Sequence, residues 1–269
     1  MSSQDVTATF QSFLDLLSAK KWDEAAEALQ PKVIYNGKDN TNDELVKHFA
    51  EYMEEDNVTH TRMDGIRVHY DGKSIGARQI MRSEDADGKR IESWGLIMVF
   101  FENNKISRYY LILHQPHLFP PPSESLAPIP APQPPLNPMS ADELREFYHV
   151  YINGYNNGTM PFEIPKRFTE VVTLNGEPFD RDLVPSFFEK ALLPIIAGLW
   201  YTVEEMVIDL EKQRIFVRLA LEGVSKNERL RKDETEGGRI KVYEQAMYDF
   251  HDGRITGGWA VQGFDMTPP

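Results

Sequence analysis

The spacing of hydrophobic residues predicts a helix at the start of each half of the chain. Apolar side chains recur every three to four positions over residues 4–19 and again over residues 140–156, which is the period of a helix buried on one face. Ser140 followed by Glu143 matches a capping box at the start of the second of these helices. Further helices are predicted over residues 23–29, 42–54 and 180–192.

Alternating apolar and polar positions predict four strands after these helices in each half. In the first half they cover residues 58–69, 74–83, 90–101 and 105–114, and in the second residues 200–209, 214–222, 239–250 and 254–264. Asn103-Asn104 and Asp252-Gly253 separate the last two strands of each half and suit two-residue hairpin turns. Helices followed by an antiparallel meander predict an α+β fold in both halves.

The two halves also align as an internal repeat. Residues 33–37 correspond to residues 172–176, each ending in Asn-Gly, and residues 98–106 correspond to residues 247–255. The offset grows from 139 to 149 residues, and residues 223–238, a charged stretch, account for the difference as a longer exposed hairpin loop. The order and spacing of elements therefore predict a duplicated domain.

Proline marks the boundary between the copies. Of 18 prolines, ten fall between Pro116 and Pro138, a stretch that can hold neither a helix nor a central strand because proline lacks the N–H donor. It is typical of an extended spacer. We therefore predict a first domain at 1–115, a proline-rich linker at 116–139 and a second domain at 140–269.

The hairpin turns also predict which residues share a sheet face. If His251 pairs with Arg254 and the ladder stays regular, Glu244 and Tyr248 share a sheet face with Trp259. Asp265 would lie on the same face if the strand continues. In the first half the same arithmetic places three residues on the corresponding face: Arg108, Tyr110 and His114. Both faces of each sheet are largely apolar, which predicts helices on one side and a second sheet on the other.

Composition narrows the possible chemistry. The chain has 269 residues and a formal charge of −13, which disfavours binding to nucleic acid or to an anionic membrane surface. The absence of cysteine excludes disulfides, thiolate nucleophiles and thiolate-ligated metals. Neither a metal-ligand spacing of histidines nor a glycine-rich nucleotide loop is visible, and neither a membrane span nor a secretory signal, so we expect a cytoplasmic protein without a cofactor.

The second half resembles a known family. Residues 215–223, residues 242–255 with their Asp-Gly-Arg-Ile end, and Trp259 look like the pattern of the SnoaL-like polyketide cyclases, within the nuclear transport factor 2-like (cystatin-like) superfamily. The resemblance implies two tandem cones, each a bent antiparallel sheet around about three helices with a pocket between them. It also implies that the outer sheet faces pack as an intramolecular pseudo-dimer. Whether the chain is monomeric in solution stays open.

Three residues are candidate catalytic groups. Glu244 lies mid-strand among apolar residues, and burial there would raise its pKa toward neutrality; the alternative is a carboxylate paired with an arginine or at a sheet edge. His114 could shuttle protons or lie at the surface beside the linker. The family often carries an acid four residues after the tryptophan, where this chain has Gly263, so Asp265 is the nearest replacement.

Aromatic residues are the candidate binding groups. Tyr148, Tyr151 and Tyr155 share a helix face and, with Tyr248 and Trp259, could form a hydroxyl-bearing cavity or an ordinary aromatic core. In the first half Tyr110 corresponds to Trp259, and Arg108 could hold an oxyanion or pair with an acid.

These residues predict one function with alternatives. The resemblance implies a cofactor-independent isomerase or cyclase acting on a hydrophobic polycyclic polyketide or terpenoid intermediate, by proton transfer and by templating of a reactive conformer. A dehydratase or epoxide hydrolase on the same fold is an alternative, as is a non-catalytic carrier or scaffold. Because Gly95 stands where the second half has Glu244, only the second half is expected to keep an active pocket.

Overall fold

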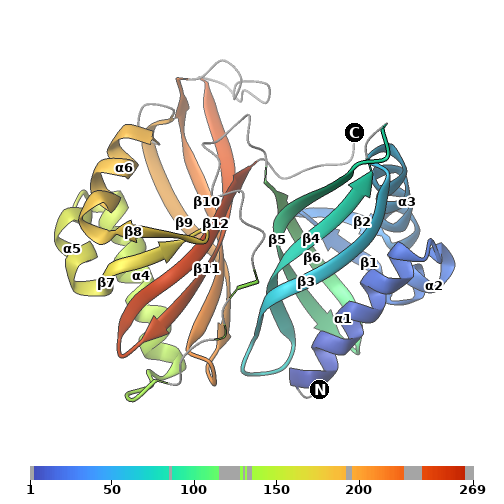
Figure 1. Ribbon diagram of the computed structural model, residues 1–269, viewed down its shortest axis with the longest axis horizontal. Coiled ribbons are helices and arrows are strands. Elements are labelled where there is room, and N and C mark those ends of the chain that lie inside the picture. The colour runs from blue at the N-terminus through green and yellow to red at the C-terminus, as the bar shows by residue number, and fades with distance from the viewer. Residues whose placement is uncertain are drawn as a thin grey trace. The chain divides into compact units, whose positions relative to one another are not determined.

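The chain forms two units in the computed structural model, which describes residues 3–84, 87–114, 128–129, 131, 135–191, 196–226 and 238–263 (Figure 1). Unit 1 comprises the described residues up to His114, and unit 2 comprises those from residue 128 onward. Most of the predicted linker and of the predicted long hairpin loop lies outside the described residues.

Unit 1 has the three predicted helices, with a short hairpin before the third of them. The four predicted long strands follow along the chain. Its elements are α1 (Ser3–Ser18), α2 (Trp22–Glu27), β1 (Leu29–Tyr35), β2 (Lys38–Thr41), α3 (Asn42–Glu55), β3 (Val58–Val68), β4 (Ser74–Glu84), β5 (Arg90–Glu102) and β6 (Lys105–Leu113). Thr41 caps α3 through a capping box with Glu44, so a polar residue ends β2 and begins the helix.

Unit 2 repeats this order and adds one short 3₁₀ turn before its third α-helix. Its elements are α4 (Ala141–Asn157), α5 (Met160–Arg167), β7 (Phe168–Leu174), β8 (Glu177–Asp180), the 3₁₀ turn η1 (Arg181–Leu183), α6 (Val184–Ala191), β9 (Ile196–Asp209), β10 (Arg214–Ser225), β11 (Arg239–His251) and β12 (Arg254–Gly263). The capping box of Ser140 with Glu143 is confirmed. The sequence did not predict α5, which carries Pro161 in its first turn and Pro165 inside.

Both sheets are six-stranded and mixed, with the order β2-β1-β6-β5-β4-β3 in unit 1 and β8-β7-β12-β11-β10-β9 in unit 2. The predicted four-stranded meander is antiparallel in each. The short hairpin β1–β2 joins the sheet through a parallel pairing with β6, and β7 pairs with β12 in the same way. The α+β prediction is confirmed, and each sheet is mixed because the hairpin before the third helix adds two strands to the antiparallel meander, one of them parallel to its neighbour.

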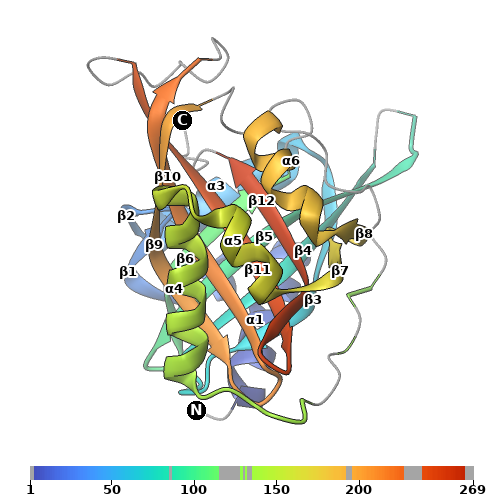
Figure 2. The ribbon, with the colours of Figure 1, turned by 90° about the vertical axis from the view of Figure 1, so that its left-hand side faces the viewer.

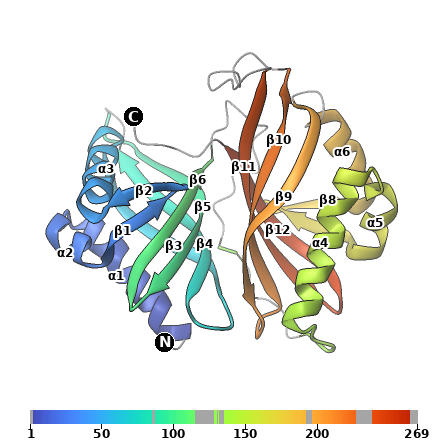
Figure 3. The same ribbon diagram turned by 180° about the vertical axis from the view of Figure 1, so that it is seen from behind.

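The helices of each unit cover one face of its sheet, and the hydrophobic core lies between them. Figure 2 shows α4, α5 and α6 across the sheet of unit 2, and Figure 3 shows α1, α2 and α3 beside the sheet of unit 1. Alternate residues of the central strands, such as Ile97 and Val99 in β5 and Ala246 and Tyr248 in β11, point into these cores. The intervening positions are also apolar, among them Leu96, Met98 and Met247.

A β-bulge follows the last hairpin turn in each unit and changes the predicted faces. The turns themselves are as predicted: His251 pairs with Arg254, and Glu102 pairs with Lys105. The last strand of each hairpin then gains a residue: Thr256 in β12, opposite the step from Asp249 to Phe250, and Ser107 in β6, opposite the step from Phe100 to Phe101. Beyond the bulge every side chain of β12 and β6 lies on the face opposite to the one a regular ladder predicts.

An asparagine turn recurs in both units and ties the short hairpin to the last strand. Asn36 has a left-handed backbone with φ 47°, and its side chain accepts from the Leu111 amide and donates to the Leu111 carbonyl. Asn175, with φ 52°, accepts in the same way from the Ala260 amide. Asparagine tolerates this backbone and also satisfies strand atoms that lack a ladder partner, so one residue type serves both purposes.

We expect Asn36→Ala to destabilise unit 1 by about 2 kcal/mol, because two buried strand atoms lose their partner and alanine disfavours a positive φ. Asn175→Ala should cost less, because within the described part of unit 2 the Asn175 side chain makes one such hydrogen bond, to the Ala260 amide. Urea unfolding of the two variants beside the native chain measures both values. Equal effects of the two substitutions would show that the backbone conformation, and not the hydrogen bonds, determines the cost.

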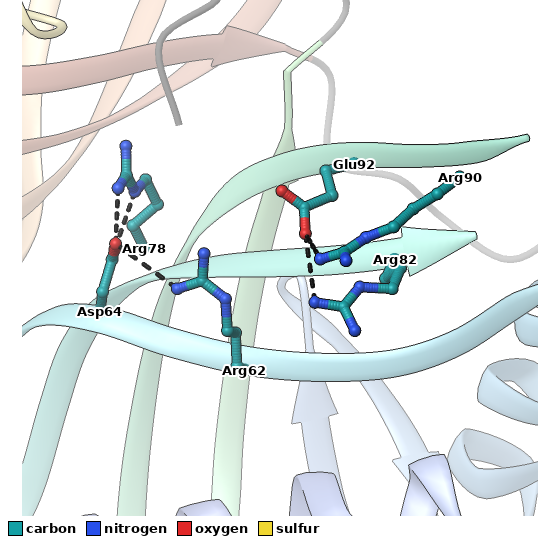
Figure 4. Close-up of polar contacts among 6 residues, drawn as sticks. All are labelled: Arg62, Asp64, Arg78, Arg82, Arg90 and Glu92. Carbon is teal, nitrogen blue, oxygen red and sulfur yellow. Dashed lines mark hydrogen bonds and ion pairs between the residues drawn. The ribbon is translucent and has the colours of Figure 1, made fainter. Parts of the chain in front are cut away.

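An ion pair between the first two strands of the meander also recurs in both units. Arg78 in β4 donates to both carboxylate oxygens of Asp64 in β3, at 2.7 and 2.5 Å, and Figure 4 shows this pair with Arg62 beside it. In unit 2 the Arg218 Nε lies 3.1 Å from a carboxylate oxygen of Glu204. The matching spacing of 14 residues in both units indicates a structural role for both arginines.

Candidate functional site

A buried carboxyl group lies in the interior of unit 2. Glu244 sits in the middle of β11, between Val242 and Ala246 on the face turned toward the helices. Its neighbour in β12 is Gln262, whose amide nitrogen donates to Oε2 of Glu244 at 2.6 Å. The hydrogen bond fixes the orientation of the carboxyl group, and the strand position holds it inside the core.

Five tyrosines surround this carboxyl group and come from three different elements. Helix α4 contributes three of them because positions 148, 151 and 155 lie one turn apart on the same face. β11 contributes Tyr248 and β9 contributes Tyr201. With Glu244 and Gln262 they form the Glu244 cluster: Tyr148, Tyr151, Tyr155, Tyr201, Tyr248, Glu244 and Gln262.

The rings of the cluster contact one another at steep angles. Tyr148 lies 5.6 Å from Tyr248 between ring centroids, and Tyr155 lies 5.3 Å from Tyr201. The hydroxyl groups of Tyr151 and Tyr155 are 2.8 Å apart. The Tyr148 hydroxyl is buried without a well-formed hydrogen bond, although Tyr248 is close enough to act on its pKa. The cluster thus combines apolar walls with several buried O–H groups.

Asn156 holds the backbone of β9 at Tyr201, the tyrosine that this strand contributes to the cluster. Its side chain donates to the Tyr201 carbonyl at 2.9 Å and accepts from the Tyr201 amide at 2.8 Å. An amide side chain can satisfy both backbone groups at once, which connects the end of α4 to a strand that lies far along the chain. The positions of the α4 tyrosines and of Tyr201 are therefore coupled.

Burial raises the pKa of Glu244 to about 7, and the hydrogen bond from Gln262 opposes this only in part. Among the described residues no arginine, lysine or histidine pairs with this carboxyl group. The described residues therefore do not form the Glu244–arginine pair that was the alternative to a catalytic role. At neutral pH the group exchanges a proton with little cost in either direction, which is the property required of a general acid or base.

The tyrosines stay protonated at neutral pH. Burial raises the pKa of each of the five well above 10, and the nearby Glu244 carboxylate raises it further. They can therefore donate hydrogen bonds but do not ionise, so Glu244 is the only group of the cluster that changes charge near pH 7.

Unit 1 does not repeat this arrangement. Gly95 occupies the position that Glu244 has in unit 2, and a Cβ added there would lie 2.6 Å from the Ile112 carbonyl oxygen. Tyr109 fills the interior beside it and donates to the Gln79 amide oxygen at 2.8 Å. In unit 2 the counterpart of Tyr109 is Gly258, which packs directly on the ring of Tyr248. A tyrosine in one copy and a glycine in the other thus distinguish the two interiors.

The bulge corrects the placement of four predicted site residues. Trp259 pairs with Met247 and lies on the face away from Glu244, whereas Gln262 takes the place beside it. In unit 1 the same shift turns three residues away from the helices: Arg108, Tyr110 and His114. The prediction that these four share the face of the pocket was wrong, because one inserted residue reverses the alternation.

On the other face Arg108, Tyr110 and His114 contact aromatic side chains of β5. The Arg108 guanidinium lies 3.7 Å from the centre of the Phe100 ring, and Tyr110 meets the same ring edge-on. His114 stacks on Trp94 at 5.1 Å, and burial lowers its pKa below the usual value. Asp265 lies outside the described residues.

The sequence missed two members of the Glu244 cluster. A regular ladder from the hairpin turn would place Gln262 on the face opposite to Glu244, and only the bulge brings the two together. Tyr201 was part of a predicted strand, but its neighbours alternate without a clear apolar face, so its direction had no signal. The paired glycines Gly257 and Gly258, next to the predicted turn, are the one feature that indicates a local irregularity in β12.

Among the residues that the structure describes, no group of three or more histidine, aspartate or glutamate side chains is arranged to hold a metal ion. No described helix combines the length and apolarity that crossing a bilayer requires. Two hollows are present on unit 1, of about 560 Å³ around Tyr52 and Ser93 and about 340 Å³ at the Asn103-Asn104 turn. Neither is lined by a predicted site residue.

Comparison with known proteins gives matches among solved structures alone. No protein-family model matches the chain, and no curated protein sequence matches it. A SnoaL-like polyketide cyclase from Agrobacterium tumefaciens matches with 26% identity over 44% of this chain and 90% of its own, at a TM-score of 0.35. IdmH from Streptomyces antibioticus, described only provisionally as a polyketide cyclase, matches with 16% identity over 44% and 91%, also at 0.35.

A third match is an NTF2-like protein of unknown function from Exiguobacterium, with 17% identity over 39% of this chain and 97% of its own, at a TM-score of 0.33. Each of these matches covers less than half of this chain but nearly all of the other protein. In structure the chain is similar to SnoaL-like polyketide cyclases and NTF2-like proteins.

Proposed function

We propose that unit 2 is an acid–base catalyst that isomerises or cyclises a hydrophobic molecule within the Glu244 cluster. One observation carries the proposal: a carboxyl group with a pKa of about 7 is buried among five protonated tyrosines and has no cationic partner among the described residues. A core selected for stability alone gains nothing from such a group, because burying an ionisable carboxyl costs free energy.

Glu244 is the proton-transfer group in this proposal. With a pKa near 7, both its protonated and its ionised form are populated, so it can remove a proton from one ligand carbon and return it to another. Gln262 holds Oε2 through its amide N–H and thereby directs the carboxyl group. The reaction needs no cofactor, because an isomerisation or cyclisation of this kind moves protons and rearranges bonds without net oxidation.

The tyrosines bind and orient the ligand. Their rings provide an apolar wall, and their O–H groups can donate to a carbonyl or hydroxyl oxygen of the ligand, including one that gains negative charge during proton transfer. Walls of this kind favour a polycyclic polyketide or terpenoid held in one conformer. Dehydration and epoxide opening would use the same groups, with water or hydroxide as the leaving or attacking species.

A non-catalytic carrier is the second candidate, and the close ring contacts of the tyrosines favour it. Tyr148, Tyr151 and Tyr248 lie within about 6 Å of each other between ring centroids, as in an ordinary aromatic core. In a carrier the ligand would leave unchanged, and Glu244 would contribute to affinity without affecting any product.

The Glu244→Gln variant distinguishes the two functions. In the producing organism we expect the variant to lose the product and to accumulate its precursor, with a rate at least about 100-fold lower, because an amide cannot accept the proton. Metabolite profiling by mass spectrometry measures both species. Glu170→Gln, an exposed acid on β7 of the same unit, is the matched control. An unchanged product spectrum in Glu244→Gln would remove Glu244 from the chemistry and leave the carrier.

A further inference from the structure

The charges of the side chains in the Glu244 cluster indicate which charge its ligand can carry. Every group of the cluster is either neutral or negative: five protonated tyrosines, one amide and one carboxyl group. All interactions of Glu244 with described residues are with these partners, and none is with a cation. A ligand that carries a carboxylate or phosphate would meet an ionised acid without compensation, so the cluster disfavours anions.

The tyrosine rings add a second feature that points to a cation. The negative π-faces of aromatic rings attract organic ammonium ions, and proteins recognise such ions with cages of several aromatic rings. Here the rings come from α4, β9 and β11 and stand at interplanar angles between 46° and 80°. All five tyrosines lie close enough to Glu244 for its carboxylate to raise their pKa values, so aromatic rings from three elements surround the one group of the cluster that can carry a negative charge.

We infer that the Glu244 cluster binds an organic ammonium ion, so that the hydrophobic ligand of unit 2 carries a basic amine with Glu244 as its counter-ion. The inference rests on the proposed function, because it names the ligand class of the same site. It differs from the neutral polyketide or terpenoid considered above in one chemical respect: a nitrogen that is positively charged when bound.

Binding of such a ligand couples to proton release. The free carboxyl group is mostly protonated below pH 7 because burial raises its pKa, and an ammonium ion requires the ionised form. The other titratable groups that face it are the tyrosines of α4, β9 and β11, whose pKa values lie well above this range. Affinity should therefore rise with pH up to about 8 and fall below pH 7 by as much as tenfold per unit.

Choline and its uncharged isostere 3,3-dimethylbutan-1-ol test the inference, since they differ only in nitrogen against carbon. Isothermal titration of the full chain at pH 8 should give choline at least tenfold tighter binding than the alcohol. Between pH 8 and pH 5 the choline affinity should drop by up to about a hundredfold, while that of the alcohol stays level. In Glu244→Gln both the preference and the pH dependence should disappear, and Glu170→Gln should keep both.

Two substitutions at one position test the role of the rings without altering the carboxyl group. Tyr155→Phe keeps the aromatic face, whereas Tyr155→Leu removes it, and thermal melts show whether each variant is folded. Choline should bind Tyr155→Phe as it binds the native chain and Tyr155→Leu at least about fivefold more weakly.

Two outcomes would overturn the inference. Equal binding of choline and the alcohol at all pH values would show that the cluster binds neutral ligands, and the proposed acid–base function would stand. Failure of choline to bind at millimolar concentration to the folded native chain would reject the ammonium ligand as well. The product analysis of Glu244→Gln decides the proposed function independently of either result.

Discussion

Glu244→Gln should make unit 2 more stable than the native unit at pH 8 but not at pH 4. We expect the difference in free energy of unfolding between variant and native chain to grow by about 3 kcal/mol over this range, since each pKa unit corresponds to about 1.4 kcal/mol. The reason is that the folded chain holds the carboxyl group at a pKa of about 7, against an ordinary value of 4.5.

The direction follows from proton binding. Between pH 4.5 and pH 7 the folded state binds the Glu244 proton more tightly than the unfolded state, so raising the pH favours unfolding. Below pH 4.5 both states are protonated, and above pH 7 both are ionised, so the full cost is present only at the higher pH. A glutamine does not titrate and does not carry this cost at any pH.

Urea unfolding of native chain, Glu244→Gln and Glu170→Gln at intervals from pH 4 to pH 8 measures the effect. Glu170 is exposed, so its variant should follow the native chain at every pH. A pH-independent difference for Glu244→Gln would mean that the carboxyl group titrates in its ordinary range, which would contradict both the acid–base proposal and the ammonium ligand.

The second large effect is expected at the buried ion pair of unit 1. Asp64→Ala should lower the free energy of unfolding by about 3 kcal/mol, because Arg78 is fully buried and loses a bidentate carboxylate. Arg62, which lies 3.8 Å from the same carboxylate, is more exposed and depends on it less.

Two comparisons isolate the cost of the unpaired charge. The double variant Asp64→Leu with Arg78→Met should recover most of the lost stability, because apolar side chains of similar size need no counter-charge. Glu204→Ala in unit 2 should cost less than Asp64→Ala, because Glu204 is more exposed and contacts Arg218 through one nitrogen at 3.1 Å. If the double variant is no more stable than Asp64→Ala, packing and not charge explains the loss.

Much of the fold and part of the site could be predicted from local pattern. The positions of α1, α3, α4 and the four long strands follow from the periodicity of apolar residues, and the Asn-Asn and Asp-Gly turns set the hairpin pairs at their closed ends. Glu244 and the three tyrosines of α4 also follow, since a helix face and a strand interior are visible in spacing alone.

The short elements could not be predicted in the same way. β2 and β8 have four residues each and alternate weakly, and their pairing with β1 and β7 depends on the positive φ of the Asn-Gly turns. The parallel pairings of β1 with β6 and of β7 with β12 join residues far apart in the chain, and nothing in the neighbouring sequence encodes such a contact.

The sequence by itself determined that the chain repeats one α+β plan, that only the second copy has an acid at the middle of its third long strand, and that tyrosines line the helix opposite. Only the tertiary structure decided which side chains share a face with that acid. A single bulged residue in β12, Thr256, brings Gln262 to Glu244 and turns Trp259 away. Because strand side chains alternate with a period of two, one extra residue reverses all later positions, and the ladder hydrogen bonds determine where that residue is inserted.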